Sequence, residues 1–127
     1  MNLKKFLPLL PVLLLAGCAT AEFTRLTPNG QPRNANNLYP VETVFESQQQ
    51  SLRWDSIQAY ILVDGQLLPM QPEKDVLNRW EGYVPVPPTV QSVKYRFKFD
   101  YTYNHFGTKP KPDSAVSPIY TLKVVDQ

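Results

Sequence analysis

The stretch VKYRFKFDYTY, residues 93–103, decides the fold of this 127-residue chain. Its odd-numbered positions are all apolar or aromatic, whereas its even-numbered positions are polar or charged. A period of two is what a β-strand produces, because successive side chains point to opposite faces. Eleven unbroken alternations therefore predict one long strand, with one face in a core and the other in solvent.

Shorter segments on both sides of this stretch have the same period. They are residues 38–46, 54–63, 66–70, 78–86 and 119–125. Asp64 and Gly65 separate two of them and suit a type I′ hairpin turn, because both tolerate a positive φ. No segment has a convincing helical period, so we expect residues 38–127 to form an all-β antiparallel sandwich of six to seven strands. We also expect Trp54 and Trp80 in its core.

Two adjacent segments carry a family resemblance. RWEGYVPVP at 79–87 followed by VKYRFKFD at 93–100 resembles the central hairpin of immunoglobulin-like early-set domains. In those domains an aromatic-led strand ending in V-P-L-P precedes a Y-x-Y/F-K-F strand. The resemblance implies an Ig-like sandwich, and some early-set domains bind glycans. The chain lacks the cysteine pair of antibody domains, since it has one cysteine.

Two regions lack a strand pattern. Residues 19–37 are rich in Asn, Pro, Gly and Thr, so we predict that 18–37 form a flexible tether ahead of the domain. An alternative is that Phe23 and Leu26 dock on the domain. Residues 104–118 carry Pro, Gly and Asn and are expected to form a long loop, a length often associated with function.

The N-terminus has the layout of a secretory signal. Lys4 and Lys5 precede a short apolar stretch at 6–15, which is too short to span a bilayer. The string LAGC then ends at Cys18 and resembles the bacterial lipobox. The resemblance implies cleavage after residue 17 and a diacylglycerol thioether on Cys18. Ala19 follows the cysteine, which by resemblance to enterobacterial sorting rules favours the outer membrane over the inner one.

Composition narrows the remaining functional classes. The formal charge is +2, which gives no support for a nucleic-acid partner. Removal of residues 1–17 also removes Lys4 and Lys5, which leaves equal numbers of basic and acidic side chains. One cysteine and one histidine provide little material for a zinc site or a redox pair. We expect no enzyme activity, and no cofactor other than the covalent lipid.

Two groups of residues near the long strand are candidate binding sites. The first combines aromatic residues with the single histidine, namely Tyr101, Tyr103, His105 and Phe106. These residues could stack on a sugar or anchor a protein, unless the strand bends and the tyrosines cap the core. The second is a basic row of Lys94, Arg96 and Lys98, which could meet an anionic partner or simply be a solvated sheet face.

These observations together predict a lipid-anchored protein of the bacterial envelope. Its membrane contact is the lipid on Cys18, and its β-sandwich is expected to be a non-catalytic interaction or structural module with an envelope protein or glycan as partner. The alternative is a lipoprotein that binds glycan or peptidoglycan through exposed aromatic residues near 104–118.

Overall fold

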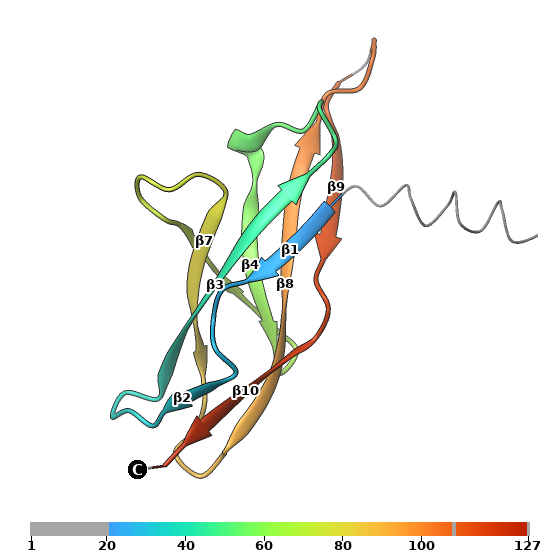
Figure 1. Cartoon of the computed structure of the whole chain (residues 1–127). Helices are drawn as coiled ribbons and strands as arrows, with labels where there is room; N and C mark the ends of the chain where they lie inside the picture. The colour runs from blue at the N-terminus through green and yellow to red at the C-terminus, as the bar shows by residue number, and fades with distance from the viewer. Residues whose placement is uncertain (1–20, 108, 127) are drawn as a thin grey trace, which may run out of the picture.

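Two β-sheets face each other in the computed structural model of the chain, which describes residues 21–107 and 109–126 (Figure 1). The first sheet has the order β1 (Ala21–Arg25), β3 (Leu38–Ser47), β7 (Arg79–Pro85), β6 (Gln71–Pro72). The second has the order β2 (Gly30–Pro32), β10 (Tyr120–Val125), β8 (Ser92–Tyr103), β4 (Gln58–Val63), β5 (Gln66–Pro69), and β9 (Lys111–Val116) also pairs with β8. The predicted all-β sandwich is confirmed.

The strand order is that of immunoglobulin-type sandwiches. β1, β3, β7 and β6 take the places of strands A, B, E and D, and β10, β8, β4 and β5 those of G, F, C and C′. β1 pairs antiparallel with β3, whereas β2 pairs parallel with β10. The segment that contains β1 and β2 therefore passes from the first sheet to the second and joins them.

The core follows the alternation that the sequence predicts. On β8, Phe97 and Phe99 are completely buried, and on β3 the same holds for Phe45. The rings of Phe45 and Phe99 stack with centroids 4.5 Å apart, which joins the two sheets at the middle of the sandwich. Between β4 and β5, Asp64 and Gly65 adopt φ angles of 50° and 74°, as the predicted hairpin turn requires.

The prediction of a flexible tether over 18–37 is wrong for the described residues 21–37. β1 pairs with β3 along its whole length, and the Phe23 ring lies 5.1 Å from that of Phe45. The guanidinium of Arg25 lies 4.5 Å from the Tyr120 ring on the other sheet. The docking alternative thus holds for Phe23, whereas Leu26 stays exposed. Five residues of alternation are too few to stand out in a polar segment.

The predicted loop over 104–118 is also wrong in part, because β9 forms within it. β9 pairs with the upper half of β8, in the register Lys98 with Val116 to Tyr103 with Lys111. β10 then pairs with the lower half. The buried Ser117 lies at the point where the partner of β8 changes from β9 to β10. The Phe97 N–H donates to Ser117 Oγ at 2.8 Å, and the Ser117 N–H donates to Phe97 O at 2.9 Å. These bonds hold the irregular backbone between the two strands.

Only one of the two tryptophans lies where the sequence predicts. Trp80 on β7 is buried, but 42% of Trp54 is exposed. Trp54 belongs to a short 3₁₀ turn, Trp54–Ser56, that precedes β4. The side-chain alternation of a strand does not extend into such a turn, so the alternation within 54–63 could not place this residue.

Candidate functional site

The aromatic residues at the upper end of β8 divide between core and surface. Tyr101 is 4% exposed, and its ring centroid lies 6.0 Å from that of Phe45. Burial raises the pKa of the Tyr101 hydroxyl, with smaller contributions from Asp113 and Tyr103. Tyr101 therefore caps the core, and no flat platform of Tyr101 with Tyr103 is presented to a sugar.

The residues beyond Tyr101 lie progressively further outside the sandwich. Tyr103 is half-buried, and it forms a β-bridge with Leu52 of the loop 48–57. The ring of His105 lies 6.3 Å from that of Tyr103. Phe106, at the turn between β8 and β9, is 99% exposed. The candidate group is thus reduced to one projecting phenylalanine with Tyr103 and His105 behind it.

The basic row on β8 is largely engaged within the fold. Arg96 donates from Nε and Nη2 to the backbone oxygen of Ser117, at 2.9 and 2.6 Å. Lys98 Nζ lies 2.6 Å from Asp100 Oδ1 on the same face. The third member, Lys94, is exposed. Arg96 therefore supports the junction of β9 and β10, and the row does not act as three cations available to an anionic partner.

A shallow polar hollow lies over the upper half of β8. It has a volume of about 530 Å³. Gln58, Asp100 and Ser114 face one another across β4, β8 and β9 and line it. The remaining lining comes from Ser56, Tyr101, Thr102, Pro112 and Asp113. The lining has many hydrogen-bonding groups, but Tyr101, its one aromatic side chain, is almost wholly buried.

An apolar groove at the edge of the sandwich was missed by the sequence analysis. Two adjoining hollows of about 480 and 400 Å³ share Trp54, Pro72 and Trp80 as lining residues. They lie where β4 and β5 of one sheet meet β6 and β7 of the other. We call this surface the Trp54 groove. Its apolar lining includes Trp54, Ile57, Pro69, Met70, Pro72, Val76, Leu77 and Trp80, and its polar lining Asp55, Gln58, Glu73, Asp75, Asn78 and Arg79.

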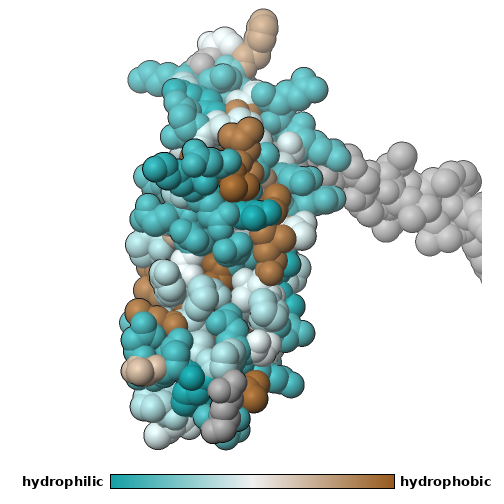
Figure 2. All heavy atoms as spheres, turned by 60° about the vertical axis from the view of Figure 1, so that its left-hand side comes forward, coloured by the Kyte–Doolittle hydropathy of each residue, from teal (hydrophilic) through white to brown (hydrophobic). Residues whose placement is uncertain are grey.

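The loop between β6 and β7 forms one wall of the Trp54 groove. Leu77 in this loop is 91% exposed and Val76 is 41% exposed. The loop lies at the left of Figure 1 and comes forward in Figure 2, where hydrophobic side chains interrupt a largely hydrophilic face. Such an exposed apolar surface around a tryptophan is typical of protein contacts. The available signal for this groove in the sequence was the adjacent apolar pair Val76 and Leu77, which stands in a segment without strand alternation.

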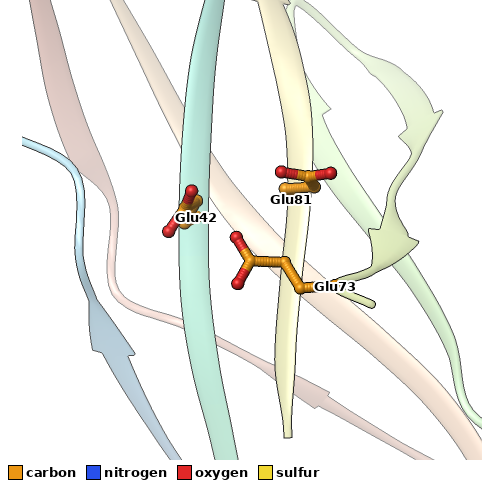
Figure 3. A group of neighbouring side chains, drawn as sticks. All are labelled: Glu42, Glu73 and Glu81. Atoms are coloured by element: carbon orange, nitrogen blue, oxygen red, sulfur yellow. The ribbon is translucent and has the colours of Figure 1, made fainter. Parts of the chain in front are cut away.

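Three glutamates meet on the outer face of the first sheet (Figure 3). Carboxylate oxygens of Glu42, Glu73 and Glu81 lie within 4.8 Å of one another, the one such group among residues 21–107 and 109–126. Burial raises the pKa of Glu42, and a hydrogen bond and repulsion from Glu73 add to the increase. Arg79 Nε lies 3.6 Å from Glu73 Oε2. Its positive charge lowers the pKa of Glu42 and so offsets part of the increase. The arginine thus already supplies positive charge to this cluster.

Cys18, for which the sequence predicts lipidation, lies outside the described residues. Within them, no helix is long and apolar enough to cross a membrane. No family model, curated protein or solved structure matches the chain.

Proposed function

We propose that this protein is a lipid-anchored protein of the bacterial envelope whose β-sandwich is a non-catalytic interaction or structural module. The observation that carries the proposal is the string LAGC ending at Cys18, after Lys4, Lys5 and a short apolar stretch. Each of these parts has the position that signal cleavage and lipid transfer need. Ala19 after the cysteine favours the outer membrane by the sorting rule given above.

The anchor would be the lipid on Cys18. Each buried methylene of an acyl chain contributes about 0.8 kcal/mol, and stable attachment takes two or more chains. A diacylglycerol thioether on Cys18 meets this requirement. The test is to grow cells expressing the full chain with an alkyne-bearing fatty acid, and to follow both label and protein in membrane fractions.

In that experiment, Cys18→Ala is expected to lose both the fatty-acid label and membrane retention. The matched control is Ala19→Ser, which changes the next residue and leaves the thiol in place. If Cys18→Ala stays in the membrane fraction as firmly as the unaltered protein, the anchor proposal fails.

The Trp54 groove is the surface that best supports an interaction role. It combines Trp54, Leu77 and neighbouring apolar side chains on a protein whose surface there is otherwise hydrophilic. Tryptophan is enriched among the residues that contribute most to protein interfaces. We propose that an envelope protein binds here. Glycan binding through Tyr103, His105 and Phe106 ranks second, because Tyr101 is part of the core.

Affinity isolation from the native membranes tests the groove. The double variant Trp54→Ala, Leu77→Asp is expected to lose the partners that the unaltered protein retains. Leu67→Asp is the control, because Leu67 on β5 is also exposed but does not line the groove. Equal recovery of partners by the groove variant and the control would contradict the proposed interface.

A further inference from the structure

The chain enters the sandwich at the end where the β8–β9 hairpin projects. β1 begins at Ala21, which is paired with Ser47, the last residue of β3. The loop that follows β3 forms a β-bridge to the end of β8 through Leu52 and Tyr103. Figure 1 shows the hairpin extending from this end, whereas β2 and the C-terminus lie at the other. The entry of the chain and the hairpin tip therefore share one end of the molecule.

Very little chain separates the proposed anchor from the domain. Consecutive Cα atoms are about 3.8 Å apart, so three peptide links from Cys18 to Ala21 reach at most about 11 Å. If Cys18 is lipidated, as proposed above, the start of β1 must lie within about that distance of the lipid headgroups. The described residues 21–37, being part of the sandwich, add no length to this reach.

The hairpin extends beyond the point where the chain enters the sandwich (Figure 1). Phe23 packs against Phe99 with ring centroids 5.3 Å apart, so Ala21, two residues before Phe23, lies near the level of Tyr101, two residues after Phe99. Phe106 lies five residues beyond Tyr101, which is at most about 16 Å at about 3.3 Å per residue. This length is comparable with the reach from Cys18 to Ala21, so an upright domain anchored at Cys18 would have its hairpin tip within reach of the headgroup layer.

We propose that the β8–β9 hairpin is a second membrane contact, with Phe106 inserted among the phospholipid headgroups. The proposal rests on lipidation of Cys18. Phe106 is 99% exposed at the tip, and a phenylalanine in that position gains by leaving water. Lys109 and Lys111 follow on the β9 side, where they face anionic headgroups, and Tyr103 is paired with Lys111 behind them. Aromatic residues and lysines at this depth are typical of membrane interfaces.

The charged side chains at this end of the two sheets indicate which side of the domain faces the membrane. Glu22 and Glu46 are paired and exposed on the first sheet at this end. The lysines lie on the hairpin of the second sheet. An anionic surface repels the first pair and attracts the second, so the domain is expected to tilt with its β8–β9 side toward the lipid.

A fluorescent probe on the full lipidated protein tests the contact. Cys18 is the only native cysteine and its sulfur would be blocked as a thioether, so an introduced cysteine is labelled uniquely. Phe106→Cys carries an environment-sensitive fluorophore, and the control is Thr89→Cys, in the exposed loop before β8 and therefore at its opposite end. Both proteins are reconstituted in vesicles of phosphatidylethanolamine and phosphatidylglycerol that contain nitroxide-labelled lipids.

The probe at position 106 is expected to have blue-shifted emission and several-fold stronger quenching by the labelled lipids than the probe at 89. Vesicle flotation of each sample tests the anchor separately, because protein that does not float shows that lipidation itself has failed. If the protein floats and both probes are quenched equally weakly, the hairpin contact is overturned. Protection at 106 in native membranes but not in the vesicles would likewise overturn it and indicate a protein partner.

Discussion

The middle and the upper end of β8 have the same residue pattern but different surroundings. In the middle, Phe97 and Phe99 are fully buried among side chains of the opposite sheet. Toward the upper end, Tyr101 is the last buried residue, Tyr103 is half-buried, and β9 supplies backbone pairing at the side. Alternation along a strand thus reports which face is apolar. Whether another layer covers that face depends on the rest of the fold.

The comparison also separates two ways of holding a strand in place. The middle of β8 is stabilised mainly by burial of aromatic rings, a contribution proportional to the apolar area removed from water. The upper end depends on hydrogen bonds to β9 and to the loop 48–57, such as that from the Arg53 N–H to Thr102 O at 2.9 Å. A backbone ladder contributes less net stability per residue than a packed ring does.

The largest expected effect is in the middle of β8. Phe99 lies 4.5 Å from Phe45 and 5.0 Å from Trp80, ring centroid to centroid. Phe99→Ala leaves a cavity between the sheets and should lower the free energy of unfolding by about 3–5 kcal/mol. Urea unfolding followed by tryptophan fluorescence measures it. Tyr83→Ala, on the exposed face of β7, is the control, and a loss as large there would refute the assignment of the core.

The sequence predicted the covered faces better than the segments that lack alternation. The long pattern at 93–103 and the turn at Asp64 and Gly65 are visible because each depends on neighbouring residues. β1 and β9 were missed because they are five and six residues long and owe their pairing to distant strands. For the same reason, the Trp54 groove, which joins β4, β5, β6 and β7, could not be derived from local spacing.

The place beside β8 where its partner changes from β10 to β9 is expected to be the next most sensitive one. Ser117 is fully buried, and its Oγ accepts the Phe97 N–H at 2.8 Å. Ser117→Ala leaves this donor without its partner, which should cost about 1–3 kcal/mol. Ser114→Ala, on the exposed side of β9, is the control in the same unfolding experiment. Equal stability of the two variants would show that the junction does not depend on this hydroxyl.

A smaller effect tests the outer surface of the first sheet, where Glu42 meets Glu73 and Glu81. A pKa raised in the folded state means that the ionised Glu42 is disfavoured there. The resulting penalty is absent below the ordinary pKa of 4.5, grows as the pH rises through the window up to the raised pKa, and is fully present above it. Glu42→Gln should therefore stabilise the protein at pH 7, by less than about 1 kcal/mol.

Thermal unfolding at several pH values measures this gain. Asp64→Asn is the control, since it removes one negative charge and keeps the hairpin turn. The gain from Glu42→Gln should disappear below the ordinary pKa of the carboxyl, near 4.5. A gain of the same size at every pH would mean that ionisation of the half-buried Glu42 is not its cause.

The smallest expected effect completes the comparison at the far end of β8. Phe106 has the same side chain as Phe99, but it is 99% exposed and has no layer above it. Phe106→Ala in the protein without lipid should change the free energy of unfolding by no more than about 0.5 kcal/mol, the range for surface positions. A loss close to that of Phe99→Ala would show that the tip packs against the sandwich, and the hairpin would then not be available to the membrane. The measurement is urea unfolding of both variants side by side, because the difference between two identical side chains isolates the contribution of their surroundings.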